Sequence, residues 1–223
     1  MKGFRVSLQL FFHPFSSYSQ KALIALYENG TPFTARVLSP DDPATGAEFA
    51  ARWPIKRFPI LVDGERTILE ASTIIEYLEV AHPGPVRLIP PDPLAAIDVR
   101  MMDRVFDNYV STPQQKLVYD ALRAPEARDA QGVADARAAL ETAYAWLDAR
   151  MSDREWAAGA FSLADCAAAP ALFYADWSHR IAERFANLLA YRARLLARPS
   201  FARAVDAARP FRPYFPLGAP DRD

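Results

Sequence analysis

The segment FSSYSQKALIAL (residues 15–26) places three serines directly before an apolar run with helical spacing. A capping box needs Ser or Thr followed three residues later by Glu or Gln, and Ser17 with Gln20 satisfies this pattern. Ser19 then falls within the first turn of the helix. Ser16 comes before the predicted cap, at a junction of strand and helix where anions are favoured. A hydroxyl at this point could hold a bound thiolate, phosphate or carboxylate, although an ordinary loop serine is the more common case on local sequence alone.

Two further positions could take part in chemistry, Pro59 in KRFPIL (56–61) and Glu70 in LEASTIIEYL (69–78). Pro59 follows an aromatic residue and precedes a hairpin, a setting in which cis X–Pro bonds occur. An ordinary proline on an edge strand is the simpler interpretation. Glu70 stands where a strand gives way to a helix, so it is either a cap residue favoured by the helix dipole or a ligand for an amine.

Alternating strands and helices must hold these positions in the first part of the chain. Asn29-Gly30 is typical of a helix end, and Asp63-Gly64 is a strong hairpin turn. The expected elements are a strand at 4–12, a helix at 17–28, a strand at 33–38, a helix at 41–53, strands at 58–62 and 66–70, and a helix at 71–83. Their order, β-α-β-α-β-β-α, predicts an α/β domain over residues 1–83.

Prolines interrupt the chain after this domain, with five of them between residues 83 and 93. We expect residues 84–94 to be a linker. Beyond it the strand signals stop, and Ala-, Leu- and Arg-rich segments with 3.6-residue periodicity predict an all-α helical bundle over 95–223. The expected helices span 95–123, with a kink or break at Pro113, 133–151, 162–180 and 185–208.

Composition narrows the class of protein. The chain has 223 residues and a formal net charge of −1, with acidic and basic residues interleaved, so neither a nucleic acid nor a membrane surface is an expected partner. No stretch reaches the roughly 20 apolar residues of a membrane span. The single cysteine, Cys166, excludes an internal disulfide and indicates a reducing compartment, so we expect the cytoplasm. The three histidines, His13, His82 and His179, show no metal-binding spacing.

Four motifs together resemble the cytosolic glutathione transferases, and the first is most similar to their serine-type classes, phi, theta and zeta. The motifs are HPFSSYSQKALIALYENG (13–30), FPILVDG (58–64), EASTIIEYL (70–78) and FSLADC (161–166). The resemblance covers the whole chain and implies a thioredoxin-like N-terminal domain and an all-helical C-terminal domain. It also implies glutathione as co-substrate, no metal, and a homodimer.

The resemblance assigns roles to individual residues. Ser16 would donate a hydrogen bond to the sulfur of glutathione, which favours the nucleophilic thiolate over the thiol. His13 is close enough in sequence to be considered as a base, but a histidine at a strand end beside proline is more often structural. The remaining glutathione contacts would come from Arg57 or Lys56 at the glycyl carboxylate, the Phe58 backbone before a cis Pro59 at the cysteinyl part, and Glu70 at the γ-glutamyl end.

The sequence departs from the family pattern after Glu70. The family usually has Ser or Thr next, whose hydroxyl and amide both hold the γ-glutamyl carboxylate, but this chain has Ala71. The Ala71 amide remains, whereas Ser72 lies about 100° further round the helix. A lost charge-assisted bond is worth roughly 1.5–3 kcal/mol, which is about ten- to a hundredfold in affinity. We expect either weak glutathione binding or compensation by Ser72 through a shifted helix start.

The FSLADC motif resembles the buried capping motif of the family's second domain. Ser162 is expected to cap a helix, with Asp165 at the third helical position. Phe161 and Cys166 have the spacing of a hydrophobic staple. We therefore interpret this motif as part of the folding apparatus and Cys166 as a core residue.

The electrophile site of the family is lined by the first helix of the bundle and often by the C-terminal tail. Phe106, Tyr109 and Val110 are spaced to share one helical face, and Pro113 could open that face. The tail RPFRPYFP (209–216) is too aromatic for a solvated terminus, so Tyr214 is a further candidate. The alternative is that Phe106 and Tyr109 belong to the core.

The predicted function is a glutathione transferase that activates glutathione for attack on a small hydrophobic electrophile. A second hypothesis is a glutathione-dependent disulfide oxidoreductase that works through two glutathiones, because the first domain has no cysteine. A third is a non-catalytic binding or regulatory module with weakened glutathione affinity, for which Ala71 is the best support.

Overall fold

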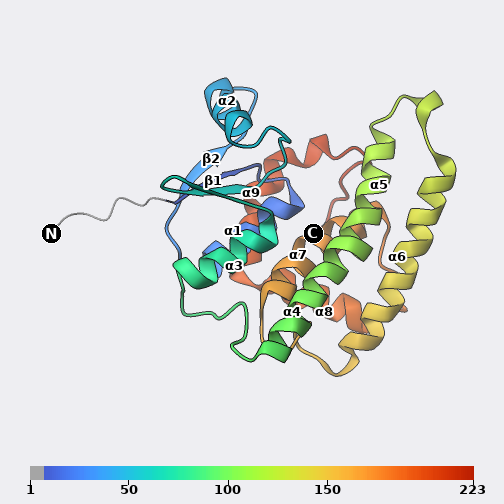
Figure 1. Cartoon of the computed structure of the whole chain (residues 1–223). Helices are drawn as coiled ribbons and strands as arrows, with labels where there is room; N and C mark the ends of the chain where they lie inside the picture. Colours follow the sequence, from blue (N-terminus) through green and yellow to red (C-terminus); the bar gives the residue numbers. More distant parts are fainter. Residues whose placement is uncertain (1–7) are drawn as a thin grey trace. The chain divides into compact units, whose positions relative to one another are not determined.

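The computed structural model describes residues 8–223 (Figure 1). The chain forms two compact units, the first ending at Leu88 and the second running from Ile89 to Asp223. The strand expected at 4–12 is observed as β1 (Leu8–Phe12), and the rest of that expected strand lies outside the described residues.

The first unit is a four-stranded mixed sheet with the strand order β2-β1-β3-β4. β1 pairs in parallel with β2 and antiparallel with β3, and β3 pairs antiparallel with β4. The elements after β1 are α1 (Ser17–Glu28), β2 (Thr34–Val37), α2 (Pro43–Arg52), β3 (Ile60–Asp63), β4 (Arg66–Leu69) and α3 (Ala71–Ala81). The β-α-β-α-β-β-α order and the thioredoxin-like fold are therefore confirmed.

The two faces of the sheet have separate cores, because successive side chains of a strand point in opposite directions. Leu10 and its neighbours on one face pack with buried residues of α1 and α3, including Leu23 and Ile74. Phe11 on the other face packs with Phe49 of α2, with ring centroids 6.4 Å apart. In Figure 1, α1 and α3 accordingly lie side by side, with α2 across the sheet from them.

The second unit is all-helical, as predicted. Its helices are α4 (Pro93–Val105), α5 (Thr112–Ala121), α6 (Ala130–Arg150), α7 (Leu163–Ser178), α8 (Ala186–Ala197) and α9 (Pro199–Ala208), followed by a 3₁₀ turn at Arg209–Tyr214. Shorter 3₁₀ turns lie at Pro125–Ala127 and Met151–Asp153.

Prolines divide two of the expected helices. The helix expected at 95–123 is interrupted by a π-helical segment at Phe106–Ser111, directly before Pro113. Proline lacks the N–H of the regular helical hydrogen bond, which explains why the ladder changes there. The helix expected at 185–208 is split at Arg198, whose φ of −75° and ψ of 127° are extended because Pro199 follows.

The predicted capping box of α7 is present. The carboxylate of Asp165 accepts hydrogen bonds from the Ser162 amide at 2.9 Å and the Ser162 hydroxyl at 3.2 Å. It also accepts from the Ala157 amide at 3.0 Å and the Tyr191 hydroxyl at 2.6 Å. Burial raises the pKa of Asp165, and these donors act against that rise. Cys166 is fully buried beside the box, as expected of a core residue.

Within 8–223, no helix is both long and apolar enough to cross a membrane. Over the same residues, there is no group of three or more His, Cys, Asp or Glu side chains that could hold a metal ion.

Candidate functional site

Strand register brings three chain segments to one edge of the sheet in the first unit. Phe11 near the end of β1 faces Ile60 at the start of β3, and Ile60 faces Leu69 at the end of β4. Neighbouring strands lie about 4.8 Å apart. The segment leading to Ser16, the Phe58–Pro59 segment and the start of α3 at Glu70 therefore leave the sheet at the same edge.

Ser16 is the N-cap of α1, so the prediction of Ser17 as the cap is wrong by one residue. The Ser16 hydroxyl oxygen accepts a hydrogen bond from the Ser19 amide at 3.3 Å. The side chain of Gln20 donates to the Pro14 carbonyl at 3.0 Å, and not back to a cap residue. A turn in which the Ser16 amide donates to the His13 carbonyl at 3.0 Å starts the helix one residue earlier.

Capping does not use up the Ser16 hydroxyl. A hydroxyl has one donor hydrogen and two acceptor lone pairs, and the bond from the Ser19 amide occupies one lone pair. Ser16 can therefore cap α1 and donate to a ligand at the same time. A ligand anion at this point would also be stabilised by the helix N-terminus.

His13 has a structural contact within the same turn. Its Nδ1 accepts a hydrogen bond from the Phe15 amide at 3.2 Å, and burial lowers the pKa of the imidazole. Because Nδ1 is an acceptor, the hydrogen of the neutral ring is on Nε2. This geometry supports the structural interpretation of His13.

The Phe58–Pro59 peptide bond is cis. No hydrogen bond within residues 8–223 uses the amide or carbonyl of Phe58, which precedes the ladder of β3. The Phe58 ring is 37% exposed and lies 6.3 Å from the ring of Phe49. The backbone of Phe58 is therefore available to a ligand, while its side chain rests on α2. Arg57 is exposed on the same segment.

Glu70 adopts an unusual backbone conformation at the start of α3. Its φ of 65° and ψ of 125° lie in a region that residues other than glycine seldom occupy. Its side chain makes no capping hydrogen bond, so no cap satisfies the first amides of α3. These amides and the helix dipole favour a carboxylate, and the exposed Glu70 side chain could bind an amine.

Ser72 contacts a residue that the sequence analysis did not single out. The Nζ of Lys21 on α1 donates a 2.9 Å hydrogen bond to the Ser72 hydroxyl, and Lys21 is only 1% exposed. Helix α3 begins at Ala71, so the shifted helix start proposed as compensation is not observed. The sequence feature that could have identified Lys21 is its position one helical turn before Ala25, on the apolar and buried face of α1.

The electrophile-site candidates do not share one exposed face. Phe106 and Val110 have no exposed surface and Pro113 is buried, so we correct their assignment to core residues of the second unit. Tyr109 is 63% exposed and Tyr214 is 76% exposed, so these two stay candidates. The expected common face assumed 3.6 residues per turn, but residues 106–111 are π-helical and have a longer repeat.

Residues 10–86 match the family model described as "Glutathione S-transferase, N-terminal domain", and residues 126–194 match "Glutathione S-transferase, C-terminal domain". A glutathione S-transferase from Methylobacterium radiotolerans, solved in complex with glutathione sulfonate, is 30% identical to the chain. The match has a TM-score of 0.77 and covers 89% of this chain and 94% of that one. This chain belongs to the glutathione S-transferase superfamily.

Two other similar proteins carry different names, one that of an enzyme and one that of a stringent starvation protein. A Methylobacillus flagellatus glutathione S-transferase with glutathione bound has the same fold, at a TM-score of 0.80 and 24% identity, over 89% of this chain and 98% of that one. A stringent starvation protein A homolog from Haemophilus ducreyi is 26% identical over 216 residues, covering 92% of this chain and 93% of its own length. The superfamily alone therefore does not decide between an enzyme and another kind of protein.

Proposed function

We propose that the protein is a glutathione transferase in which Ser16 stabilises the thiolate of bound glutathione. The observation that carries this proposal is the sheet register, which directs the Ser16 turn, the Phe58–Pro59 segment and the start of α3 to one edge. These segments offer a hydroxyl donor, free backbone groups and uncapped helix amides, which suit a thiol, a peptide and a carboxylate respectively.

Glutathione would bind along this edge as a short peptide. The backbone of Phe58 would pair with the cysteinyl residue, and Arg57 would meet the glycyl carboxylate. The Ala71 amide at the N-terminus of α3 would hold the γ-glutamyl carboxylate, and Glu70 would bind the γ-glutamyl amine. In this proposed binding mode, the cysteinyl sulfur would lie beside Ser16 at the N-terminus of α1.

For the conjugation reaction, the main contribution of the protein would be to stabilise the thiolate of bound glutathione. A hydrogen bond from Ser16 and the dipole of α1 both favour the charged thiolate, so they lower the pKa of the bound thiol. The thiolate attacks an electrophilic carbon, a carbon–sulfur bond forms, and the leaving group departs with its electron pair. Tyr109 and Tyr214 are the exposed aromatic candidates for contact with the electrophile.

Glutathione titration and conjugation of an aryl halide test this proposal directly. We expect glutathione to bind, and its bound thiol to ionise at a lower pH in the wild type than in Ser16→Ala. Ultraviolet difference absorbance of the thiolate measures this shift. Ser17→Ala is the matched control, because Ser17 makes no capping bond in the structure. Equal thiol ionisation in the wild type and Ser16→Ala would refute the role of Ser16.

The second candidate is a non-catalytic binding or regulatory module. Ala71 supports it, because this position lacks the hydroxyl that the family uses, and so does the similarity to the stringent starvation protein A homolog. This candidate predicts that millimolar glutathione leaves the melting temperature unchanged. The transferase predicts a rise, because a ligand that binds only the folded state stabilises it.

A glutathione-dependent disulfide oxidoreductase is distinguished by its substrate. Cys166 is fully buried, so a mixed disulfide with this residue is not available, and two glutathiones would have to carry the electrons. Reduction of a small disulfide without conjugation of any aryl halide would favour this activity over the transferase. The buried, single cysteine is compatible with the cytoplasm that we propose as the compartment.

We also infer that the protein is a homodimer. Leu94, Ile97 and Met101 are 74%, 57% and 44% exposed on α4. Their spacing of three and four residues places them on one side of the helix as an apolar stripe. Apolar stripes on a surface are typical of protein interfaces, and a second copy of this chain is the partner that the family similarity favours.

A further inference from the structure

The second unit contains a cavity of about 360 Å³. It opens between α5 and α6, which lie side by side in Figure 1, and the last turn of α7 and the tail complete its wall. The lining residues are Leu117, Asp120, Ala121, Arg128, Val133, Arg137, Ser178, Pro216 and Leu217. A volume of this size is typical of sites for small molecules.

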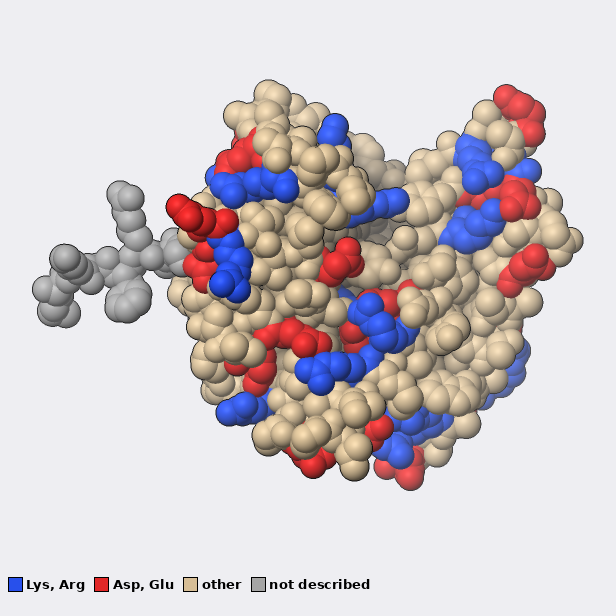
Figure 2. Space-filling model, in the orientation of Figure 1, with Lys and Arg blue, Asp and Glu red and all other residues tan. Residues whose placement is uncertain are grey.

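Two arginines at this cavity have no side-chain partner in the part of the chain that the structure describes. The guanidinium groups of Arg128 and Arg137 make no hydrogen bond or ion pair with any residue from 8 to 223, whereas the nearby Lys116 pairs with Asp129. Figure 2 shows basic side chains together with acidic ones over the ends of α5 and α6. Guanidinium groups match the geometry of a carboxylate, which they can bind through two hydrogen bonds.

The remaining polar groups of the lining are already engaged. Asp120 is 6% exposed and accepts a 2.8 Å hydrogen bond from the Asp129 amide. The Ser178 hydroxyl accepts from Gln114 at 2.9 Å and donates to the Tyr174 carbonyl at 2.9 Å. Two arginines against one aspartate leave the lining with one net positive charge, so a monoanion balances it.

The apolar part of the wall is built from Leu117, Val133 and the tail residues Pro216 and Leu217. The tail is held in place by contacts made before and after these two residues in the sequence. Directly before them, Phe215 is buried against Trp177, with ring centroids 5.4 Å apart.

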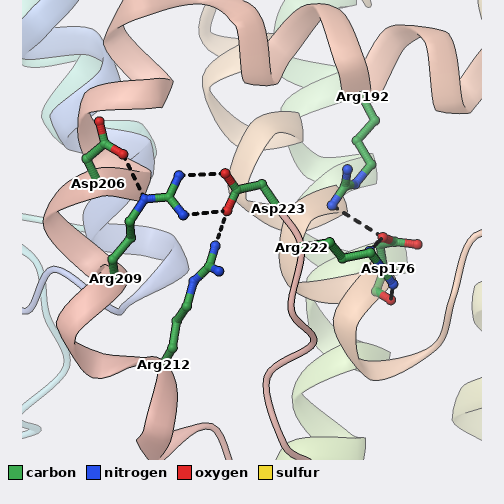
Figure 3. A network of polar contacts seen from close by, with 7 residues as sticks. All are labelled: Asp176, Arg192, Asp206, Arg209, Arg212, Arg222 and Asp223. Carbon is green, nitrogen blue, oxygen red and sulfur yellow. Dashed lines mark hydrogen bonds and ion pairs between the residues drawn. The ribbon is translucent and has the colours of Figure 1, made fainter.

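After the wall residues, the last two residues of the chain form ion pairs, which Figure 3 shows. Arg222 pairs with Asp176, and Asp223 pairs with both Arg209 and Arg212. Two independent anchors therefore hold the tail against α7 and the 3₁₀ turn. The part of the cavity wall that the tail forms is thus fixed within the folded second unit.

We propose that this cavity binds a small apolar carboxylate, with its carboxylate on Arg128 and Arg137 and its apolar body against Leu117, Val133 and Leu217. All residues that line this site belong to the second unit. An amine is disfavoured, because the two arginines would repel it and the one acid, Asp120, already accepts the Asp129 amide.

Calorimetric titration of the full chain with 1-naphthoate tests this site, with the neutral 1-naphthalenemethanol as the matched compound. We expect Arg128→Gln and Arg137→Gln each to weaken naphthoate binding by about tenfold or more, because each removes a charged donor. Arg123→Gln changes the charge nearby by the same amount, but Arg123 does not line the cavity, and its guanidinium donates a 3.3 Å hydrogen bond to the Ala127 carbonyl.

We expect the affinity of the Arg123→Gln variant to stay within about twofold of the wild type. The neutral alcohol should bind at least about tenfold more weakly than naphthoate, and added salt should weaken naphthoate alone. All three variants alter exposed side chains, and equal melting temperatures will confirm that they fold. Absence of saturable naphthoate binding, an equal loss in Arg123→Gln, or equal binding of the alcohol would overturn the proposal.

Discussion

The Nζ of Lys21 donates a 2.9 Å hydrogen bond to the hydroxyl of Ser72, and this contact joins the buried face of α1 to the first turn of α3. Ser16 caps the N-terminus of α1, and Ala71 is the first residue of α3. The contact therefore connects the helix that carries the proposed thiolate donor to the helix that carries the proposed γ-glutamyl site. A lysine that is 1% exposed also needs its acceptors, because burial of an unpaired charge is unfavourable.

Replacement of Ser72 by Ala should destabilise the first unit. The variant removes an acceptor of the buried Lys21 ammonium, which should lower the free energy of unfolding by about 1–3 kcal/mol. Denaturant titration measures this loss. Thr73→Ala is the control, since Thr73 is exposed on the same helix turn. Equal stability of the two variants would show that the Lys21–Ser72 bond contributes nothing.

Two substitutions of Ser16 should separate capping from chemistry. Ala removes the cap and the proposed thiolate donor, so it should lower stability by about 0.5–2 kcal/mol and lower turnover as well. Asp caps as well as Ser, but its carboxylate cannot donate and repels a thiolate. We therefore expect Ser16→Asp to keep stability and lose conjugation of an aryl halide. Normal turnover in Ser16→Asp would contradict the proposed donor.

The Ser16 assignment shows how far local sequence rules reach. The strand, the helix and their junction follow from periodicity and from the position of proline, and the structure confirms them. The cap itself was misplaced, because Ser17 and Gln20 fit the motif better than Ser16. The choice depends on the turn in which the Ser16 amide meets the His13 carbonyl, and no local pattern encodes that turn.

The bundle shows the same limit at a larger scale. Its helical content was predictable from periodicity, and the interruption near Pro113 from the missing N–H. The π-helical path of residues 106–111 could not be predicted from the sequence, because tertiary packing decides which residues of such a segment are buried. Lys21 was missed for a similar reason, since its acceptor lies 51 positions later in the chain.

Replacement of Asp176 by Asn should strongly destabilise the second unit. Asp176 is 5% exposed and lies 3.3 Å from the guanidinium of Arg192, which is itself 8% exposed. Without this carboxylate the buried cation has no counter-charge there, a loss of about 3–5 kcal/mol. Arg222→Gln removes the more exposed partner of Asp176 and should cost about 1 kcal/mol or less. Denaturant unfolding that ranks these two variants in the opposite order would refute this account.

The Asp223 ion pairs should make stability depend on pH. Burial by itself raises the pKa of Asp223, but hydrogen bonds from Arg209 and the charge of Arg212 outweigh it, so the pKa is lowered. The pairs therefore stabilise the folded state above the unfolded pKa of about 3.9, and this contribution is lost as the pH falls through the lower folded value.

Asp223→Asn should accordingly reduce stability by about 1 kcal/mol at neutral pH. The difference from the wild type should shrink as the pH falls below about 4. Asp221→Asn is the control, because Asp221 is exposed and has no ion pair within residues 8–223. Thermal unfolding over a pH series measures both differences. A gap between wild type and Asp223→Asn that stays constant down to low pH would exclude the ion pairs as its cause.

A charge in the apolar stripe of α4 should dissociate the proposed homodimer. Ile97 is 57% exposed at the centre of the stripe, and a glutamate there would have to be desolvated in the interface without a partner. We expect Ile97→Glu to have the mass of one chain in light scattering, where the wild type has that of two. Leu122→Glu places the same charge at a residue that is 65% exposed beyond the end of α5, and it should remain dimeric. A monomeric wild type, or dissociation by both variants, would show that the stripe does not bind a second copy.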